Sequence, residues 1–229
     1  MSVLSHLSKV FERIIYKQID TFMTTKFSPF ICGFRKSHNA QYSLLKMIET
    51  WKNHLDQGKK IGAIFMDLSK AFDTIDHSLL LAKMKAYGFS TNSLRLLQSY
   101  LCHRYQRVNI NGSFSEWKMI SVGVPQGSIL GPLFFNIFIN DIFLIPLSCS
   151  ISNYADDNTL YAINDSMSEI KLSLSIDFSL LMEWFDENHM VLNPDKCHYM
   201  IFGHTDANDS INLNGNEIMY KEHEDILGV

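Results

Sequence analysis

Three short segments carry the residues best suited to chemistry in this chain of 229 residues. In chain order they are FMDLSKAFD (65–73), VPQGSILGP (124–132) and YADD (154–157). The first and third supply carboxylates, which are hard oxygen ligands for divalent metals. The second is rich in glycine and proline and leaves room for a ligand close to the backbone. Metals held by carboxylates beside such a surface suit phosphoryl transfer, so the set indicates polymerisation of nucleotides.

Asp67 ends the apolar run IGAIFMD (61–67), which is too short for a helix and suits a strand buried on both faces. An ionised carboxylate at that position is costly unless it meets a cation or several hydrogen-bond donors. A bound metal satisfies this need. The alternative is that Asp67 caps a helix starting at Ser69.

Asp156 and Asp157 lie between the run SCSISNY (148–154) and TLYA (159–162), a pattern that predicts two strands around a tight polar turn. Adjacent aspartates in such a turn are commonly turn formers and nothing more. A metal site here requires Asp67 to lie nearby.

The loop PQGSILGP (125–132) precedes an apolar helix and specifies an unusual backbone. Gly127 has no side chain to obstruct a ligand, and Gln126 can reach a base or sugar edge. A plain connection between a strand and a helix is the alternative.

Hydrophobic periodicity and turn residues place the remaining elements. Helices are predicted at 4–22, 39–55, 77–87, 91–103, 131–143 and 166–189. Strands are predicted at 61–67, in the pair within 149–162, at 198–202, and in hairpins around Asn111-Gly112 and within 211–218. Ser37 or Asn39 is the predicted N-cap of the 39–55 helix, and Thr91 that of the 91–103 helix. Gly88 is predicted to end the 77–87 helix, and Ser166 with Glu169 to form a capping box at the start of the last helix.

This order of elements predicts an α+β fold with an antiparallel sheet and helices on one face. Asp67 and Asp156 would then lie on neighbouring strands. The other helices and the Asn111-Gly112 hairpin would form a second, more basic layer.

Charge is unevenly distributed. Residues 1–120 hold 17 Lys and Arg against 8 Asp and Glu, whereas residues 121–229 hold 3 against 16. The basic first half is suited to binding phosphates, and the acidic second half to presenting carboxylates. The alternative is that both are solvated surfaces whose charges balance each other.

The hydrophobic fraction of 46% supports a core of one domain, with or without a companion subdomain. The four cysteines form no CxxC pair, which argues against a zinc site or a disulfide framework. No signal peptide and no apolar stretch of 18 residues is present, so we expect a soluble intracellular protein, in the nucleus or cytoplasm, with no membrane contact.

The chain resembles the reverse transcriptase domain of non-LTR (LINE-type, jockey-like) retrotransposons and is related to group II intron reverse transcriptases. The resemblance spans nearly the whole chain. It rests on LSKVFERIIYKQI, GFRKSHNA, FMDLSKAFDTIDH, GVPQGSILGPLFFNIFINDI, YADD, LNPDKC and the terminal LGV.

By resemblance, Asp67 and Asp156 bind two Mg²⁺ ions, for which Mn²⁺ can substitute, with Asp157 beside them. The carbonyl of Leu68 is a further metal ligand, and Asp67, Asp156 and Asp157 are the catalytic acids. The backbone N–H groups of Lys70 and Ala71 meet the nucleotide phosphates.

Phe72 matches the steric-gate position of the family, where a ring excludes a ribose 2′-hydroxyl; taken alone it is an ordinary core phenylalanine. Gln126 and Gly127 match the loop at the nascent base pair and template. Lys196 matches a lysine that protonates pyrophosphate, and Arg35 a basic contact to template or triphosphate. Each of the last two is otherwise a solvated surface residue.

The sequence departs from the family at Ile31, two residues before the glycine of GFR, where the family often has Gln.

The resemblance also implies a right-hand polymerase architecture. Residues 1–60 would be partial fingers and 61–229 the palm, with a fingers-like insertion at about 88–123. The partners would be an RNA template, a DNA primer and dNTPs. We expect the thumb and endonuclease regions to lie outside this chain, which predicts weak synthesis or none. Two alternatives stay open: a nucleic-acid-binding remnant, and an inactive fragment of a retrotransposon.

Overall fold

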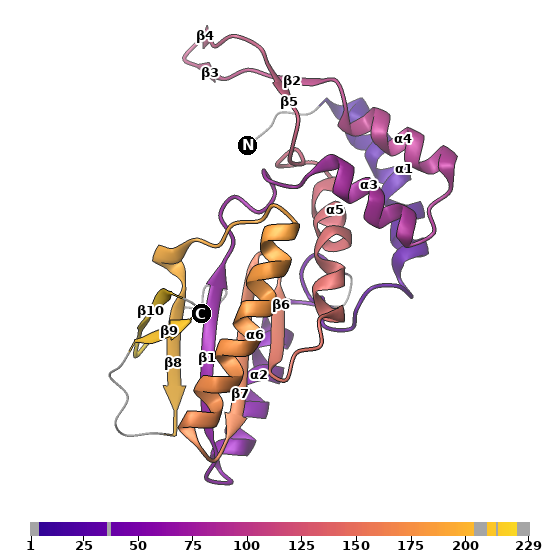
Figure 1. Ribbon diagram of the computed structural model, residues 1–229. Helices are drawn as coiled ribbons and strands as arrows, with labels where there is room; N and C mark the ends of the chain where they lie inside the picture. Colours follow the sequence, from indigo (N-terminus) through magenta and orange to yellow (C-terminus); the bar gives the residue numbers. More distant parts are fainter. Residues whose placement is uncertain (1–4, 36–37, 204–209, 214, 224–229) are drawn as a thin grey trace. The chain divides into compact units, whose positions relative to one another are not determined.

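The computed structural model describes residues 5–35, 38–203, 210–213 and 215–223 (Figure 1). Lys36, Ser37 and the terminal LGV, which belong to predicted motifs, lie outside these ranges. The chain divides into two compact units. The helical unit is formed by Met1–Phe27 and Lys70–Ile139, and the sheet unit by Ser28–Ser69 and Asn140–Val229. We describe each unit by itself.

The sheet unit is built on six strands in the order β6-β7-β1-β8-β10-β9. The strands are β1 (Lys60–Asp67), β6 (Ser150–Tyr154), β7 (Asp157–Asn164), β8 (His198–Phe202), β9 (Ile211–Leu213) and β10 (Asn216–Tyr220). β1 is antiparallel to both β7 and β8, whereas β10 runs parallel to β8. The unit is completed by the helices α2 (Ala40–Leu55) and α6 (Met167–Glu187) and the 3₁₀ turns η1 (Asn140–Leu144) and η2 (Pro194–Lys196).

Helices cover both faces of this sheet, so the prediction of helices on one face is wrong (Figure 1). On one face, Met47 and Trp51 of α2 belong to a buried cluster with Ile61, Ala63 and Phe65 of β1. On the other face, a Cβ added to Gly62 would lie 2.5 Å from Ile170 Cγ2 and 3.0 Å from Leu174 Cδ1, both on α6. Because successive strand residues point to opposite faces, α2 and α6 cover opposite sides of β1.

The helical unit contains α1 (His6–Met23), α3 (His77–Ala86), α4 (Thr91–Leu101) and α5 (Leu130–Ile139). The predicted 131–143 helix is therefore divided, because its last turns belong to η1. Two short ribbons project from this unit: β2 (Arg104–Gln106) with β5 (Lys118–Ile120), and β3 (Asn109–Ile110) with β4 (Ser113–Phe114). Asn111 and Gly112 have φ values of 49° and 86°, as a two-residue hairpin turn requires. This hairpin prediction is confirmed.

The helix caps follow the predictions in part. Asn39 caps α2, because its side chain accepts a hydrogen bond from the Tyr42 N–H at 2.7 Å. α4 is capped by Ser90 instead of Thr91. Ser166 is the N-cap of α6, but its side chain makes no cap hydrogen bond, so the capping box does not form.

Candidate active site

The acidic residues meet at the ends of two central strands. In the register of β1 and β7, Asp67 is the direct partner of Asp157. Directly opposed residues of an antiparallel pair share one face, with Cβ atoms about 4.5–5.5 Å apart. Asp156 lies in the turn before β7, so the residue opposite Asp67 is Asp157 and the predicted placement of Asp156 on a strand is wrong.

No helix starts directly after Asp67. Residues 69–74 form turns and bends, and the next helix begins at His77. The alternative interpretation of Asp67 as a helix cap is therefore excluded. Its carboxylate stays at a strand end, 24% exposed, beside a second acid.

Two buried asparagines shape the turn that carries Asp156. Asn153 donates from Nδ2 to the Ala155 carbonyl at 2.8 Å and to Asn158 Oδ1 at 3.0 Å. Asn158 in turn donates from Nδ2 to the Asp156 carbonyl at 3.2 Å. Both amides are 1% exposed, so the turn is fixed from inside. Sequence reasoning missed them, although an asparagine on each side of YADD was a visible signal.

Lys196 is brought to Asp67. Its Nζ lies 3.3 Å from Asp67 Oδ2 and 3.4 Å from Oδ1. Because the lysine side chain is 62% exposed, this ion pair adds little stability and leaves the ammonium accessible to a ligand.

The backbone of the segment before Lys196 is tied to the end of β1. The Asn193 N–H donates to the Asp67 carbonyl at 2.9 Å, and the Ser69 N–H donates to the Val191 carbonyl at 2.8 Å. Leu68, a predicted metal ligand through its carbonyl, is 3% exposed and forms an isolated bridge with Leu192. These bonds fix the distance between the acid and the lysine.

The neighbouring Cys197 thiol is kept protonated. Burial is the main cause that raises the pKa of this thiol, and the charge of Asp67 also raises it. A hydrogen bond to the Asp67 backbone lowers the pKa, but the net direction is upward. A neutral thiol is a poor ligand for a hard cation. The ionic groups at this site are therefore the carboxylates and Lys196.

The GFR segment packs directly against the acidic turn. Ile31 forms a parallel bridge with Asn153, and a Cβ on Gly33 would collide with the Ala155 backbone nitrogen. Arg35 donates from Nη1 to the carbonyls of Ser28 at 3.0 Å and Ile31 at 3.2 Å, which holds this loop in shape.

We expect Gly33→Ala to disturb the acidic turn, because the added methyl group collides with the Ala155 backbone. The loss of stability should be about 1–3 kcal/mol, and amide exchange should rise at residues 153–158. Gly58→Ala is the control: Gly58 has φ +79° and open space around it, so the substitution strains the backbone without a collision. Unchanged exchange at Ala155 in Gly33→Ala would contradict the contact.

The loop 125–132, called the PQG loop below, lies in the helical unit and is hydrogen-bonded to the segment that follows Asp67. Gln126 donates from Nε2 to both carboxylate oxygens of Asp73, at 3.0 and 3.1 Å. The Val124 N–H donates to the Phe72 carbonyl at 2.8 Å. With its amide nitrogen turned to Asp73, Gln126 has its carbonyl oxygen left to accept a hydrogen bond from a ligand.

A buried histidine reinforces the same connection. His77 is 8% exposed, and its Nε2 lies 2.7 Å from the carbonyl oxygen of Gly123, two residues before the loop. Gly123 has φ 81°, and a Cβ there would come within 2.6 Å of the Asp73 carbonyl oxygen. Only glycine allows this close approach, which sequence reasoning did not anticipate.

Glu12 is a second feature that sequence reasoning missed. It is 1% exposed, and its carboxylate accepts hydrogen bonds from the Tyr100 hydroxyl and the Ile129 N–H, both at 2.7 Å. Burial first, and then the hydrogen bond to Glu12, raise the pKa of Tyr100 to about 12. The carboxylate thus joins α1 and α4 to the PQG loop.

The other predicted substrate residues also lie in the helical unit. Phe72 is half-buried, with its ring centroid 4.8 Å from that of Phe135. Lys70 has φ 50° in a turn, Ala71 is 3% exposed, and Gly127 is exposed with φ 93°. The acids, Lys196, Leu68 and Arg35 belong to the sheet unit.

Within the described ranges, no three His, Cys, Asp or Glu side chains form a group that could hold a metal. The opposed pair of Asp67 and Asp157 fits Mg²⁺ nonetheless, because that ion commonly takes one or two carboxylates and completes its shell with water and substrate phosphates. The donor chemistry is therefore compatible with the predicted ions.

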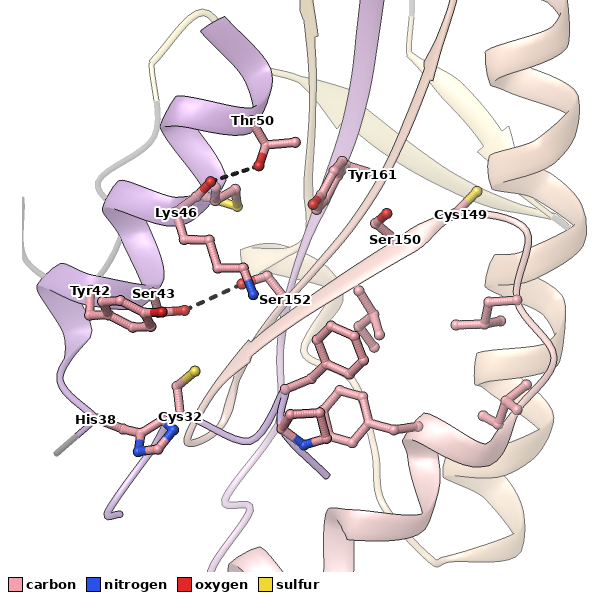
Figure 2. Close-up of a pocket in the computed structure, with 17 residues that line it drawn as sticks. Cys32, His38, Tyr42, Ser43, Lys46, Thr50, Cys149, Ser150, Ser152 and Tyr161 are labelled. Carbon is pink, nitrogen blue, oxygen red and sulfur yellow. Dashed lines mark hydrogen bonds between the residues drawn. The ribbon is translucent and has the colours of Figure 1, made fainter. Parts of the chain in front are cut away.

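A separate hollow of about 540 Å³ lies between α2 and β6 in the sheet unit (Figure 2). Figure 2 shows Lys46, Ser43 and Ser152 at its wall, with the Ser43 and Ser152 hydroxyl oxygens 3.5 Å apart. Burial, followed by the hydrogen bond and charge of Asp177, raises the pKa of Cys149 at its rim to about 12. No predicted site residue lines this hollow, and the protonated Cys149 thiol is not a nucleophile.

In the part of the chain that the structure describes, no helix has the length and apolar character needed to cross a membrane.

Comparison with known proteins places these features in a family. The family model described as "Reverse transcriptase (RNA-dependent DNA polymerase)" matches residues 1–229. The RNA-directed DNA polymerase from mobile element jockey of Drosophila melanogaster is 27% identical over 100% of this chain and 26% of its own length. The probable RNA-directed DNA polymerase from transposon BS of the same species is 29% identical over 86% of this chain and 22% of its own length.

Solved structures show the same fold. Apo telomerase from Candida tropicalis matches with a TM-score of 0.63 at 12% identity, over 93% of this chain and 39% of the other. Telomerase from the same species in complex with a fragment of telomeric RNA matches with a TM-score of 0.60 at 15% identity, over 93% and 36%. The chain spans about a quarter of the length of the curated relatives above.

Proposed function

Because this chain belongs to the reverse transcriptase family, we propose that it is the RNA-directed DNA polymerase domain of a non-LTR retrotransposon of the jockey type. The observation that carries the proposal is the register of β1 and β7, which sets Asp67 opposite Asp157. Two like charges facing each other on adjacent strands destabilise the sheet, so the pair is suited to a bound cation. The name of the jockey relative describes the same activity.

The sheet is proposed to be the palm, with the helices before residue 60 as partial fingers and residues 88–123 as an insertion. The predicted division at residue 60 remains a proposal, since the two compact units have different boundaries. RNA template, DNA primer and dNTPs are the proposed partners. One structural neighbour is described in complex with telomeric RNA, which supports RNA binding.

The chain's own residues have distinct proposed roles in nucleotide transfer. Asp67, Asp156 and Asp157, with the Leu68 carbonyl as a further ligand, would hold two Mg²⁺ ions beside the reacting phosphates. Such ions, when bound, lower the pKa of a primer 3′-hydroxyl and neutralise the triphosphate. Lys196, accessible and 3.3 Å from Asp67, donates a proton to the departing pyrophosphate.

Substrate selection is proposed to involve the other residues. The Lys70 and Ala71 N–H groups bind phosphate oxygens, and Arg35 contacts template or triphosphate. Gln126 presents its carbonyl oxygen to the nascent pair, since Asp73 takes its amide nitrogen. Gly127 next to it lets the ligand approach the backbone.

Primer extension on an RNA template with dNTPs and Mg²⁺ or Mn²⁺ tests the proposal. We expect the folded chain, or the chain lengthened beyond Val229, to extend the primer. If only the lengthened protein extends the primer, the added region is needed to bind the template–primer duplex. If neither folded protein extends the primer, the polymerase proposal is wrong.

Phe72→Val should raise the use of ribonucleotides, because a smaller side chain leaves space for a 2′-hydroxyl. The ratio of kcat/KM for dNTP and rNTP should fall by at least about tenfold. Phe89→Val is a matched control, since Phe89 is also half-buried in an aromatic pair, with Phe22 at 4.9 Å between ring centroids. If both variants keep the wild-type preference, Phe72 is not the gate.

A further inference from the structure

The two ribbons at residues 104–120 expose an unusual set of side chains, which we call the hairpin surface. Its large apolar members are each more than half exposed: Tyr105 58%, Val108 59%, Ile110 66%, Phe114 55%, Trp117 59% and Met119 60%. Scattered exposed apolar residues are normal, but a cluster of six on one short projection indicates a binding surface.

Arg107 is held within this surface by two aromatic rings. Its guanidinium carbon lies 3.9 Å from the Phe114 ring centroid and 4.6 Å from that of Trp117. Among the residues that the structure describes, Arg107 makes no hydrogen bond and no ion pair, so its N–H groups have no protein partner. Stacking orders the planar group while leaving its donors for an anion.

The charge around the surface favours an anionic partner. Arg104, Arg107 and Lys118 lie within residues 104–120, and Glu116 is the one acid in that range. The helical unit to which the surface belongs has eleven Lys and Arg against five Asp and Glu. An uncharged protein partner would cover the rings but leave these cations without counter-charges.

We propose that the hairpin surface binds single-stranded nucleic acid, with Arg107 contacting a phosphate and the Phe114 and Trp117 rings stacking on bases. Alternating cations and exposed rings are the combination that binds single strands without reading their sequence. A duplex offers the phosphates but keeps its bases stacked inside, so it satisfies only half of the surface. The proposal goes beyond nucleotide transfer and does not depend on the carboxylates.

Tryptophan fluorescence tests this directly. Trp51 and Trp184 are 6% and 8% exposed, so Trp117 is the tryptophan that a ligand can reach. Titration with oligo(dT) or an unstructured RNA should quench its emission, with an affinity that decreases as salt rises. Quenching by blunt duplex DNA with equal affinity, or by anionic vesicles alone, would overturn the proposal.

Variants separate the hairpin surface from general charge effects. Arg107→Gln should weaken binding at least about tenfold, and Arg107→Lys should recover only part of the loss, because lysine keeps the charge without the planar fork. Arg95→Gln removes the same charge from an exposed position on α4 and should change affinity less than about twofold. Equal losses for Arg107→Gln and Arg95→Gln would overturn the proposal.

Failure of this proposal can be told apart from failure of the polymerase proposal. The wild-type chain should bind the oligonucleotide without Mg²⁺ and without dNTPs, conditions under which no nucleotide is transferred. If it does, and neither the chain nor its lengthened form extends a primer, the hairpin surface stands and the polymerase function does not. If primers are extended while Arg107→Gln binds like the wild type, the hairpin proposal alone is wrong.

Discussion

Replacing Asp156 and Asp157 together by asparagine should abolish primer extension, with a loss of more than about a hundredfold. Asp157 is the strand partner of Asp67, and Asp156 precedes it in a turn fixed by buried amides. Asparagine keeps the size of each side chain but cannot supply the negative charge that a divalent cation requires. Because the substitution also removes repulsion between opposed acids, the variant should be at least as stable as the wild type.

Thermal unfolding with and without Mg²⁺ gives a second readout that does not depend on turnover. Mg²⁺ should raise the Tm of the wild type and leave that of the double variant unchanged, since only a bound ligand stabilises the folded state. Asp165→Asn is a suitable control, because it alters an exposed acid just beyond the opposite end of β7. Retained synthesis by the folded double variant would refute the proposed role of these acids.

Glu12→Ala is the other substitution with a large expected effect. It leaves the partly buried Ile129 N–H and Tyr100 hydroxyl without their partner, and it opens a cavity where the buried Glu12 side chain was. We expect the free energy of unfolding to fall by about 2–4 kcal/mol. Glu12→Gln should recover most of this, because its amide oxygen can accept from Ile129 while its NH₂ group donates to the Tyr100 oxygen.

Denaturant unfolding and amide exchange at Ile129 measure the two consequences. Exchange at Ile129 should increase in Glu12→Ala more than in Tyr100→Phe, which keeps the bond to the loop and should lose only about 1 kcal/mol. Equal Ile129 exchange in the wild type and Glu12→Ala would show that the carboxylate does not hold the loop.

The pH dependence follows from the raised pKa of Tyr100. Its value rises from 10 to about 12 in the folded protein, so the protonated hydroxyl contributes stability that is complete below pH 10 and is lost as pH rises through 12. Tyr100→Phe should therefore show a smaller decrease in stability between pH 10 and 12. A decrease should remain, because burial also raises the pKa of Tyr199 to about 12.

Local signals in the sequence predicted local structure well. The Asn111-Gly112 turn and the Asn39 cap depend on residues a few positions apart, and both are confirmed. Ser90 replaced Thr91 as a cap because neighbouring hydroxyl residues compete for the same role within one residue. The apolar run of β1 predicted a strand buried on both faces, and its burial confirms this. The order of the elements alone did not show that α2 and α6 are the helices that cover the two faces.

Long-range contacts could not be read in the same way. The pairing of Asp67 with Asp157 depends on strand register over a separation of about ninety residues. Glu12 lay in an amphipathic helix, where a charged residue is ordinarily placed on the solvent side, and only packing shows it to be buried. The approach of Gly33 to Ala155 is likewise a contact between distant segments.

The central position of β1 also bears on how the protein is made. β1 ends at Asp67, but its neighbours β7 and β8 are synthesised only when residues 157–164 and 198–202 emerge. At about 5–20 residues per second, this strand, which is apolar from Ile61 to Met66, waits several seconds for its first partner. A nascent or prematurely terminated chain therefore exposes a strand with two unpaired edges, which predicts that products ending before residue 157 aggregate or need a chaperone.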